Sequence, residues 1–228
     1  SRREYTKASP FVVLLGKGVH KVTSSWAAPR YGEFQTTLGI TRSNITFIGQ
    51  GIGETTILGG FGIHNVQNIT LKQMTVTNKC NRGIGIQIHG ALVALVDVAT
   101  LRCGANGIRV YSHISTPSQL VATRCEMSNN GGSGLSISNS NSNISHNVCL
   151  KNFISHYNSR YGIWISGNGV VSIHGDASAI RSNGSCGIFA AISAKVLLHL
   201  PSHHNTSYNN YDEDRRTQGG GTITNVED

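Results

Sequence analysis

The chain has 228 residues and a formal net charge of +8, but only 13% of its residues are charged. An average soluble protein carries about 25% charged residues, and surface helices are usually rich in Glu and Lys. The composition therefore argues against a helical protein, and the absence of an apolar run of about 18 residues argues against a membrane-spanning helix. The chain begins at Ser1 without Met, which indicates a processed or trimmed product whose localisation the sequence does not reveal.

The first 36 residues are predicted to form an entrance strand and a cap. Residues 11–15 are an apolar run, residues 16–18 form a Gly-rich turn, and residues 19–22 resume a strand. Residues 24–36 contain Pro, Gly and several aromatic residues, a composition typical of a loop or an entrance cap.

A Gly followed by Ile or Leu recurs along the middle of the chain, at Gly83, Gly107, Gly134, Gly162 and Gly187. The interval between copies is similar each time but not constant. A repeat of this kind predicts a solenoid, because each unit must stack on its neighbours to bury its apolar face. The drift in spacing predicts loops of variable length around a constant core.

Each repeat is predicted to contain two strands and a polar turn. The first strands are expected at 84–88, 108–111, 135–138, 163–166 and 188–192, and the second at 92–98, 120–123, 144–150, 170–174 and 196–200. Short strands joined by loops, without the periodicity of a helix, favour an all-β, single-stranded parallel β-helix. We expect about eight or nine coils over residues 37–210, followed by a polar cap or tail at 211–228.

Asparagines precede three of the repeat glycines by the same interval, at Asn130, Asn158 and Asn183. Identical amides stacked between coils can hydrogen-bond to one another. These residues are therefore predicted to form a structural ladder rather than to contact a ligand.

Four cysteines also follow the repeat. Cys80, Cys103, Cys125 and Cys149 succeed one another at intervals close to the length of one coil. Their spacing predicts a ladder of thiols at neighbouring positions. Side chains stacked in this way point in the same direction, so free thiols are favoured over disulfides. No close Cys pair is present, and neither a metal nor a cofactor is expected.

The chain resembles right-handed parallel β-helix proteins of the pectate-lyase-like superfold. The resemblance covers about residues 11–210 and includes the segments 16–22, 43–51 and 56–58. The segment 195–207 is similar to that of uncharacterised β-helix-repeat proteins of algae, protists and their large viruses. The resemblance implies the fold, whereas function must be argued from a site.

Many members of the superfold cleave or epimerise acidic polysaccharides, but their motifs are missing here. The chain lacks the RxPxxR-like motif and calcium-binding aspartates of pectate lyases, and the Asp-Pro-His signature of C5-epimerases. Glu126 and Asp97 are expected on neighbouring coils, but their repeat positions do not match, so they are not predicted to act as a glycosidase pair. No catalytic residue is assigned by the resemblance.

The candidate ligand-binding residues are His174, Asp176, Lys195 and His199. The two histidines are one repeat apart and each ends a second strand, so both are expected on one outer face. His, Asp and Lys side chains there could bind an anionic sugar, or supply a base and a cation for β-elimination. An ordinary surface role is the competing interpretation. A second series, at His64, His89 and His113, is interpreted as a consequence of coil repetition.

Three functions remain open at this point. The first is a non-catalytic β-helix that binds a glycan, such as an acidic polysaccharide, or another protein along its side. The second is a polysaccharide lyase, epimerase or hydrolase, which the fold and the positive charge favour. The third is a structural component of a virion or a cell surface. The basic residues do not cluster with aromatic residues, so nucleic acid is not an expected partner, and an oligomer is possible.

Overall fold

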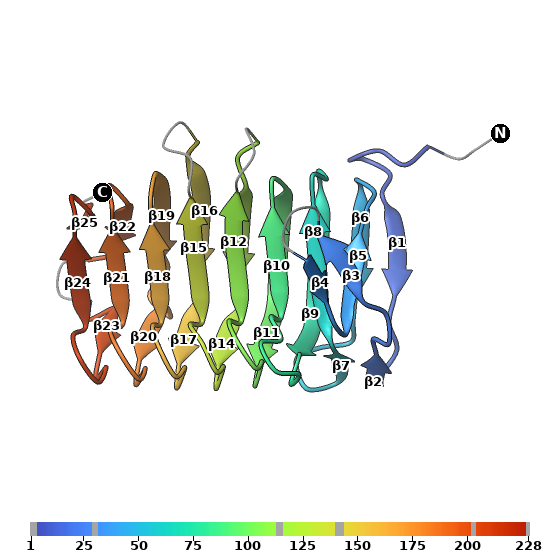
Figure 1. Ribbon diagram of the computed structural model, residues 1–228, viewed down its shortest axis with the longest axis horizontal. Coiled ribbons are helices and arrows are strands. Elements are labelled where there is room, and N and C mark those ends of the chain that lie inside the picture. Colours follow the sequence, from blue (N-terminus) through green and yellow to red (C-terminus); the bar gives the residue numbers. More distant parts are fainter. Residues whose placement is uncertain (1–3, 29–31, 113–115, 140–143, 202–203, 227–228) are drawn as a thin grey trace.

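The computed structural model describes residues 4–28, 32–112, 116–139, 144–201 and 204–226. This part of the chain contains strands and turns and no helix. The strands form a parallel β-helix, which confirms the predicted all-β solenoid, with about seven turns where eight or nine were expected. In Figure 1 the rungs follow one another along the long axis from the N-terminus to the C-terminus.

The solenoid has three faces, which we number by the order of the strands (Figure 1). Face 1 consists of β5 (Thr37–Ile40), β8 (Gly60–His64), β10 (Ile86–His89), β12 (Ile108–Ser112), β15 (Leu135–Asn139), β18 (Ile163–Ser166), β21 (Ile188–Ala191) and β24 (Arg215–Gln218). Face 2 consists of β1 (Phe11–Leu14), β6 (Ile45–Ile48), the first halves of β9 (Ile69–Thr77) and β11 (Leu92–Leu101), β13 (Gln119–Thr123), β16 (His146–Lys151), β19 (Gly169–His174), β22 (Lys195–His199) and β25 (Thr222–Asn225). Face 3 consists of β2 (Gly18–Lys21), β7 (Thr55–Leu58), the second halves of β9 and β11, β14 (Glu126–Ser128), β17 (Ile154–His156), β20 (Ala179–Arg181) and β23 (Ser207–Tyr208).

The core lies inside the three faces, because side chains alternate between the two sides of each strand. On face 1, Ile163 and Ile165 are fully buried while Trp164 between them faces outward. The same alternation on face 2 buries Val171 and Ile173. Burial of one such aliphatic side chain contributes about 2 kcal/mol, so the stacked rungs stabilise one another through a continuous apolar column.

Residues with a positive φ turn the chain between faces 2 and 3. Gln73 and Asp97 have φ of 55° and 53°, and they bend β9 and β11 so that one sheet covers two faces. Arg124, with φ 51°, occupies the next corner, and its guanidinium donates two hydrogen bonds of 2.7 Å to the Asp97 carboxylate. This exposed pair lowers the pKa of Asp97, mainly through the hydrogen bonds from Arg124.

Both ends of the described chain take part in the solenoid. β1 and β2 pair in parallel with β6 and β7, and β24 and β25 pair in parallel with β21 and β22. Strand pairing thus continues into the segments 1–36 and 211–228 that the sequence suggested as caps.

A short hairpin lies within the expected entrance loop. β3 (Trp26–Ala28) and β4 (Gly32–Phe34) pair antiparallel, and the hairpin packs on the outside of face 1. Trp26 lies so close over Gly39 and Gly62 that a Cβ on either glycine would come within 2.2 Å of the indole. These two glycines therefore make room for the hairpin rather than turning the chain.

Candidate functional site

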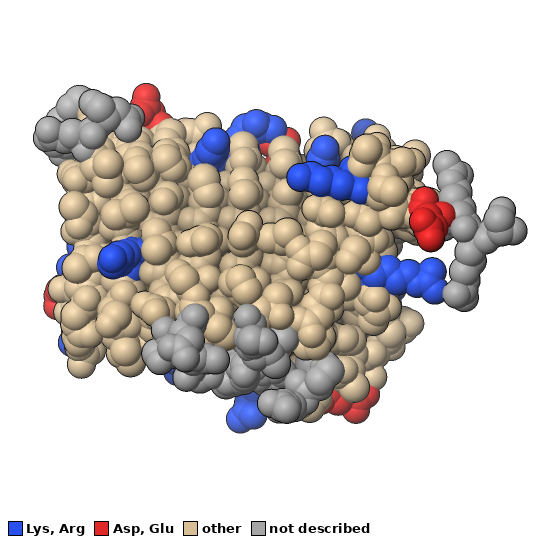
Figure 2. Space-filling view, turned by 90° about the horizontal axis from the view of Figure 1, so that it is seen from above, with Lys and Arg blue, Asp and Glu red and all other residues tan. Residues whose placement is uncertain are grey.

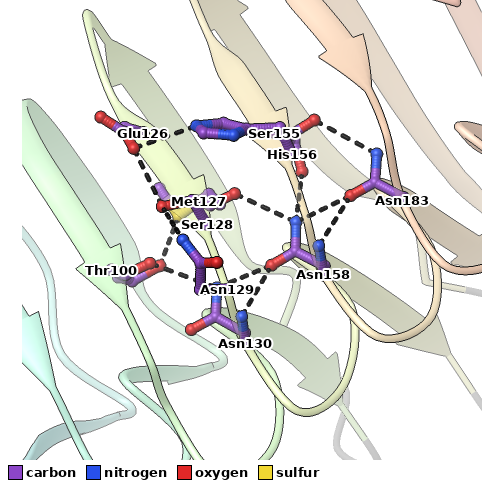
Figure 3. Close-up of polar contacts among 10 residues, drawn as sticks. All are labelled: Thr100, Glu126, Met127, Ser128, Asn129, Asn130, Ser155, His156, Asn158 and Asn183. Atoms are coloured by element: carbon purple, nitrogen blue, oxygen red, sulfur yellow. Dashed lines mark hydrogen bonds and ion pairs between the residues drawn. The ribbon is translucent and has the colours of Figure 1, made fainter. Parts of the chain in front are cut away.

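The turn between faces 3 and 1, which we call the Asn corner, contains a column of buried amides (Figure 3). It comprises residues 78–83, 103–107, 130–134, 158–162, 183–187 and 210–214. The Nδ2 of Asn130 donates to Oδ1 of Asn158 at 2.9 Å, and Asn158 donates in the same way to Asn183 at 3.0 Å. Asn183 continues the column to Asn210 at 2.9 Å. The Oδ1 atoms of Asn158, Asn183 and Asn210 each also accept a backbone N–H of the preceding coil, so these amides stabilise the stack of coils.

Cys103 occupies the position that an asparagine has in the following coils. Its backbone N–H donates to Oδ1 of Asn130 at 3.0 Å, as the backbone of Asn130 does to Asn158. Burial raises the pKa of the Cys103 thiol to about 11, so the thiol is protonated and unreactive near neutral pH.

The expected cysteine ladder does not form. Cys103 lies in the Asn column, whereas Cys149 pairs in register with Val121 on the outer side of face 2. Cys125 lies at a third position, the start of face 3, and all five cysteines of the chain are free thiols. Equal spacing in the sequence did not give equal positions in the coil, because loop lengths differ from coil to coil.

The outside of the Asn corner changes abruptly between two neighbouring coils. The backbone N–H of Gly132 donates to the carbonyl of Ala105 at 2.9 Å, and that of Arg160 donates to Gly132 at 3.1 Å, so these three residues are stacked. Two coils with small residues are thus followed by a coil with Arg160 and Tyr161. With Trp164 on the adjoining strand β18, these residues form what we call the aromatic step.

The aromatic step is one wall of a hollow of about 470 Å³. The rest of the lining consists of glycines, an alanine and small polar residues. The full lining is Gly104, Ala105, Asn106, Gly131, Gly132, Ser133, Ser136, Arg160, Tyr161 and Trp164. A Cβ on Gly131 would lie 2.5 Å from the Gly104 carbonyl, and one on Gly132 would lie 2.3 Å from Asn106 Oδ1. Close stacking of the coils therefore requires glycine at both positions.

The rings behind the step form a hydrophobic cluster outside the core. Tyr161 and Trp164 pack against buried Cys186 and Phe189, and the rings of Tyr161 and Phe189 have centroids 5.4 Å apart. The guanidinium of Arg216 lies 5.4 Å from the centre of the Phe189 ring. Apolar side chains on the outer face of a solenoid contribute little to the core, and they are a common feature of binding surfaces.

Arg160 lines the hollow, and further arginines lie along face 1 without forming a dense basic patch. Arg109, Ser136, Trp164, Phe189 and Arg216 follow one another in register across face 1. The row thus has an arginine at each end and aromatic rings near its middle. Figure 2, which views another side of the rod, shows the same sparse pattern of Lys and Arg among uncharged residues.

Face 3 has an outward acid–imidazole pair, also drawn in Figure 3. His156 Nε2 lies 3.1 Å from Glu126 Oε1, and Ser128 Oγ donates to the same carboxylate oxygen at 2.9 Å. Arg181 follows His156 in register, and its guanidinium lies 5.7 Å from the ring centre of Tyr157. On the sequence alone, Glu126 was considered only as a partner of Asp97. In the structure, Asp97 instead forms an ion pair with Arg124 at the corner between faces 2 and 3.

The predicted ligand residues on the last coils come together only in part. The rings of His174 and His199 stack with centroids 4.2 Å apart and an interplanar angle of 11°, on the same outer side of face 2. Lys195 starts the same strand that His199 ends, four positions away, which is roughly 13 Å along a strand. Asp176 is exposed beyond the corner, and its carbonyl accepts a hydrogen bond from His204. Ligand binding at these four residues stays a prediction.

The other histidine series also stacks where it is described. His64 and His89 are in register with centroids 4.5 Å apart, whereas His113 lies outside the described residues. His89 is buried beside Tyr111, and burial lowers the pKa of His64.

The described residues contain neither a metal-binding cluster nor a membrane-spanning helix. No group of three or more His, Cys, Asp or Glu side chains in that part of the chain is placed to hold a metal ion. No helix within the same residues is long and apolar enough to cross a membrane.

The aromatic step is the feature that sequence reasoning missed. The prediction rested on titratable side chains and therefore on the histidines of the last coils, whereas Tyr161 and Trp164 carry no such signal. Aligning the Asn corners by coil reveals the change from Gly132-Ser133 to Arg160-Tyr161.

Two solved structures similar to this chain are the A-modules of mannuronan C-5 epimerases AlgE4 and AlgE6 from Azotobacter vinelandii. The AlgE4 module is 15% identical, with 96% of this chain and 92% of that chain covered and a TM-score of 0.28. The AlgE6 module is 12% identical, with 97% and 92% covered and a TM-score of 0.34. No family model and no curated protein matches, so nothing supports the suggested likeness to proteins of algae, protists and large viruses.

Proposed function

We propose that this protein is a non-catalytic β-helix that binds a glycan on its side, in the hollow beside the aromatic step. The observation that carries the proposal is the break in the Asn corner, where Arg160 and Tyr161 follow two coils of small residues. Neither side chain takes part in the hydrogen bonds of the Asn column. The fold therefore does not require large residues at these positions.

The hollow has the two kinds of group that a sugar needs. The C–H face of a sugar ring can pack on a partly exposed aromatic ring, here Trp164 or Tyr161. Its hydroxyl groups can exchange hydrogen bonds with short polar side chains, here Ser133 and Ser136. A ligand bound in this way gains orientation from few polar contacts, as in most small-molecule sites.

The charge of the protein favours an acidic glycan over a neutral one. The chain carries +8 overall, Arg160 lines the hollow, and Arg109 and Arg216 lie in the row of face 1 that contains Trp164. A guanidinium can bind a carboxylate through two parallel hydrogen bonds. The proposal therefore predicts tighter binding of uronic-acid chains than of neutral chains, and binding that weakens as salt is added.

The test is calorimetric titration of the protein with a panel of uronic-acid, sulfated and neutral oligosaccharides. Trp164→Ala should weaken binding by at least about tenfold, which corresponds to about 1.4 kcal/mol. Tyr211→Ala is a matched control, because Tyr211 is an 84% exposed aromatic residue in another copy of the Asn corner. Equal loss in both variants, or binding unchanged by Trp164→Ala, would contradict the proposal.

The second candidate function is a polysaccharide lyase, epimerase or hydrolase. It is favoured by the outward Glu126–His156 pair, which could transfer a proton, and by Arg181 beside it, which could neutralise a sugar carboxylate. The same panel incubated with the protein, and assayed for reducing ends and for unsaturated products, tests this candidate. Product formation that is lost in Glu126→Gln would establish the enzyme, and absence of product would leave the binding function.

A further inference from the structure

A second hollow lies on the Asn corner beside the β3–β4 hairpin, and we call it the hairpin hollow. Its volume is about 280 Å³, and its lining includes the aromatic ring of Phe34 from β4. Polar side chains of the lining include Gln35, Asn78, Asn81, Arg82 and Gln87. The hairpin hollow thus combines the same kinds of group as the hollow at the aromatic step, namely an aromatic ring, an arginine and uncharged polar side chains.

The two hollows lie on consecutive coils of the same corner. The backbone N–H of Gly104, which lines the hollow at the aromatic step, donates to the carbonyl of Asn78 at 2.8 Å. The N–H of Ala105 donates in the same way to the carbonyl of Gly83, and both Asn78 and Gly83 line the hairpin hollow. Residues of one lining are thus stacked directly on residues of the other.

The stacking of the corner sets the distance between the two hollows. Backbone hydrogen bonds join Gly83 to Ala105, Ala105 to Gly132 and Gly132 to Arg160, one coil at a time. These three steps span about 14 Å, because stacked strands lie about 4.8 Å apart. The rungs follow one another along the long axis of the molecule in Figure 1, so a ligand that reaches both hollows must lie along the rod.

An exposed arginine lies at each end of this span. Arg160 lines the hollow at the aromatic step, and Arg82, directly before Gly83, lines the hairpin hollow. Among the described residues, neither guanidinium has a carboxylate within ion-pair distance, whereas the guanidinium of Arg124 is paired with Asp97. Both side chains are therefore available to bind acidic groups of a ligand.

The hairpin adds residues to the corner that the stack of coils does not require. The ring of Phe34 stacks on Trp26 with centroids 5.8 Å apart, and Trp26 packs on the outside of face 1. Glu33 also lines the hairpin hollow, where its carboxylate accepts a hydrogen bond from Ser25 Oγ of the same hairpin. As at the aromatic step, side chains outside the repeat create a hollow on the Asn corner.

From these two hollows we infer that the ligand is a linear acidic oligosaccharide, long enough to extend along the rod from the aromatic step to the hairpin hollow. The inference rests on the proposed function and adds the length of the chain, its direction and a second place of contact. One part of the chain packs at Trp164 and Arg160, and another part binds at Phe34 and Arg82. Joining two modest contacts in one chain raises the affinity, because the second contact becomes intramolecular.

The test is calorimetric titration with galacturonate and mannuronate oligomers of two, four and six units. The affinity should rise at least about tenfold from the dimer to the hexamer, because only the longer chain reaches both hollows. Arg82→Gln should weaken binding of the hexamer about fivefold and leave binding of the dimer unchanged. Arg102→Gln is the matched control, because Arg102 is an exposed arginine of the next coil that also has a positive φ but is in neither lining.

Failure of the inference can be told apart from failure of the proposed function. Equal affinities for the dimer and the hexamer would overturn the inference, and so would a loss in Arg82→Gln no larger than that in Arg102→Gln. The proposed function would stand in either case if Trp164→Ala weakened binding of both oligomers. Absence of binding by every oligomer, or binding that Trp164→Ala does not weaken, would overturn the proposed function and the inference together. Circular dichroism verifies the fold of each variant.

Discussion

The inner and outer sides of the Asn corner follow different rules. On the inside, asparagines recur coil after coil and bind one another, so each position is determined by the coil above and below it. On the outside, residue size varies from coil to coil, and Arg160, Tyr161 and Trp164 follow two coils of small residues. In a solenoid, the repeated residues thus account for the fold, and departures from the repeat indicate where a function has been added.

The largest effect is expected from removing one amide of the inner column. Asn158→Ala would leave the buried amides of Asn130 and Asn183 without partners on one side. The free energy of unfolding should fall by about 3 kcal/mol, because unsatisfied buried groups cost more than a lost hydrogen bond. Chemical denaturation measures this loss, and Asn147→Ala, at an exposed position of β16, is the control. A loss below that of the control would show that the column is not structural.

A graft on the outer side should have the opposite outcome. Replacing Arg160-Tyr161 by Gly-Ser copies the corner of the preceding coil, residues 132–133. The free energy of unfolding is expected to change by less than about 1 kcal/mol, since these side chains lie outside the main core. Glycan binding in the calorimetric panel should nevertheless be lost. If the variant still binds the glycan, the glycan does not bind at the aromatic step and the proposed site is wrong.

The column of amides can also be extended at Cys103, where a thiol occupies the position of an asparagine. Cys103→Asn would place an amide between Asn78 and Asn130, where the thiol forms no short hydrogen bond. The space is suitable, because Gly85 faces the Cys103 sulfur as Gly107 faces the Asn130 amide. We expect the midpoint of denaturation to rise, with a gain of about 1 kcal/mol. If Cys103→Asn is less stable than the wild type, the column of amides cannot be extended toward the N-terminal coils.

The smallest effect is expected from His146, which lies at the corner between faces 1 and 2. Burial lowers the pKa of its imidazole below the ordinary value of about 6.5. Because the folded-state pKa is the lower one, the stabilisation is present above that ordinary value and is lost as the pH falls below it. His146→Asn keeps an acceptor for the Ser118 N–H and does not titrate. Unfolding measured between pH 7 and pH 5 should therefore depend less on pH in this variant than in the wild type.

The repeat made much of the fold predictable from the sequence. The glycines at 107, 134, 162 and 187 each directly precede a strand of face 1, and the Asn residues four positions before the last three lie in one column. Both signals depend on direct contact between equivalent residues of adjacent coils. Asn210 was not predicted to belong to the column, because its corner ends in Asp214, where the other corners end in Gly.

Features that depend on contacts between different parts of the coil could not be predicted. Trp26 packs on face 1 because Gly39 and Gly62, which are far apart in the sequence, lie side by side beneath it. The spacing of the cysteines did not predict their positions in the coil, because loops of different length connect strands that stack in register. The change at the aromatic step can be found by aligning the corners in the sequence, but the packing of Tyr161 and Trp164 with Phe189 depends on contacts between coils.

The most direct measurement is to determine both the unfolding free energy and the glycan affinity of two variants, Asn158→Ala and Trp164→Ala. The account predicts that Asn158→Ala loses about 3 kcal/mol of stability but binds normally under conditions where it is folded. Trp164→Ala should remain nearly as stable as the wild type and lose binding by at least about tenfold. If Trp164→Ala is destabilised as much as Asn158→Ala and binds normally when folded, the outer side of the corner is structural, and the proposed binding site is contradicted.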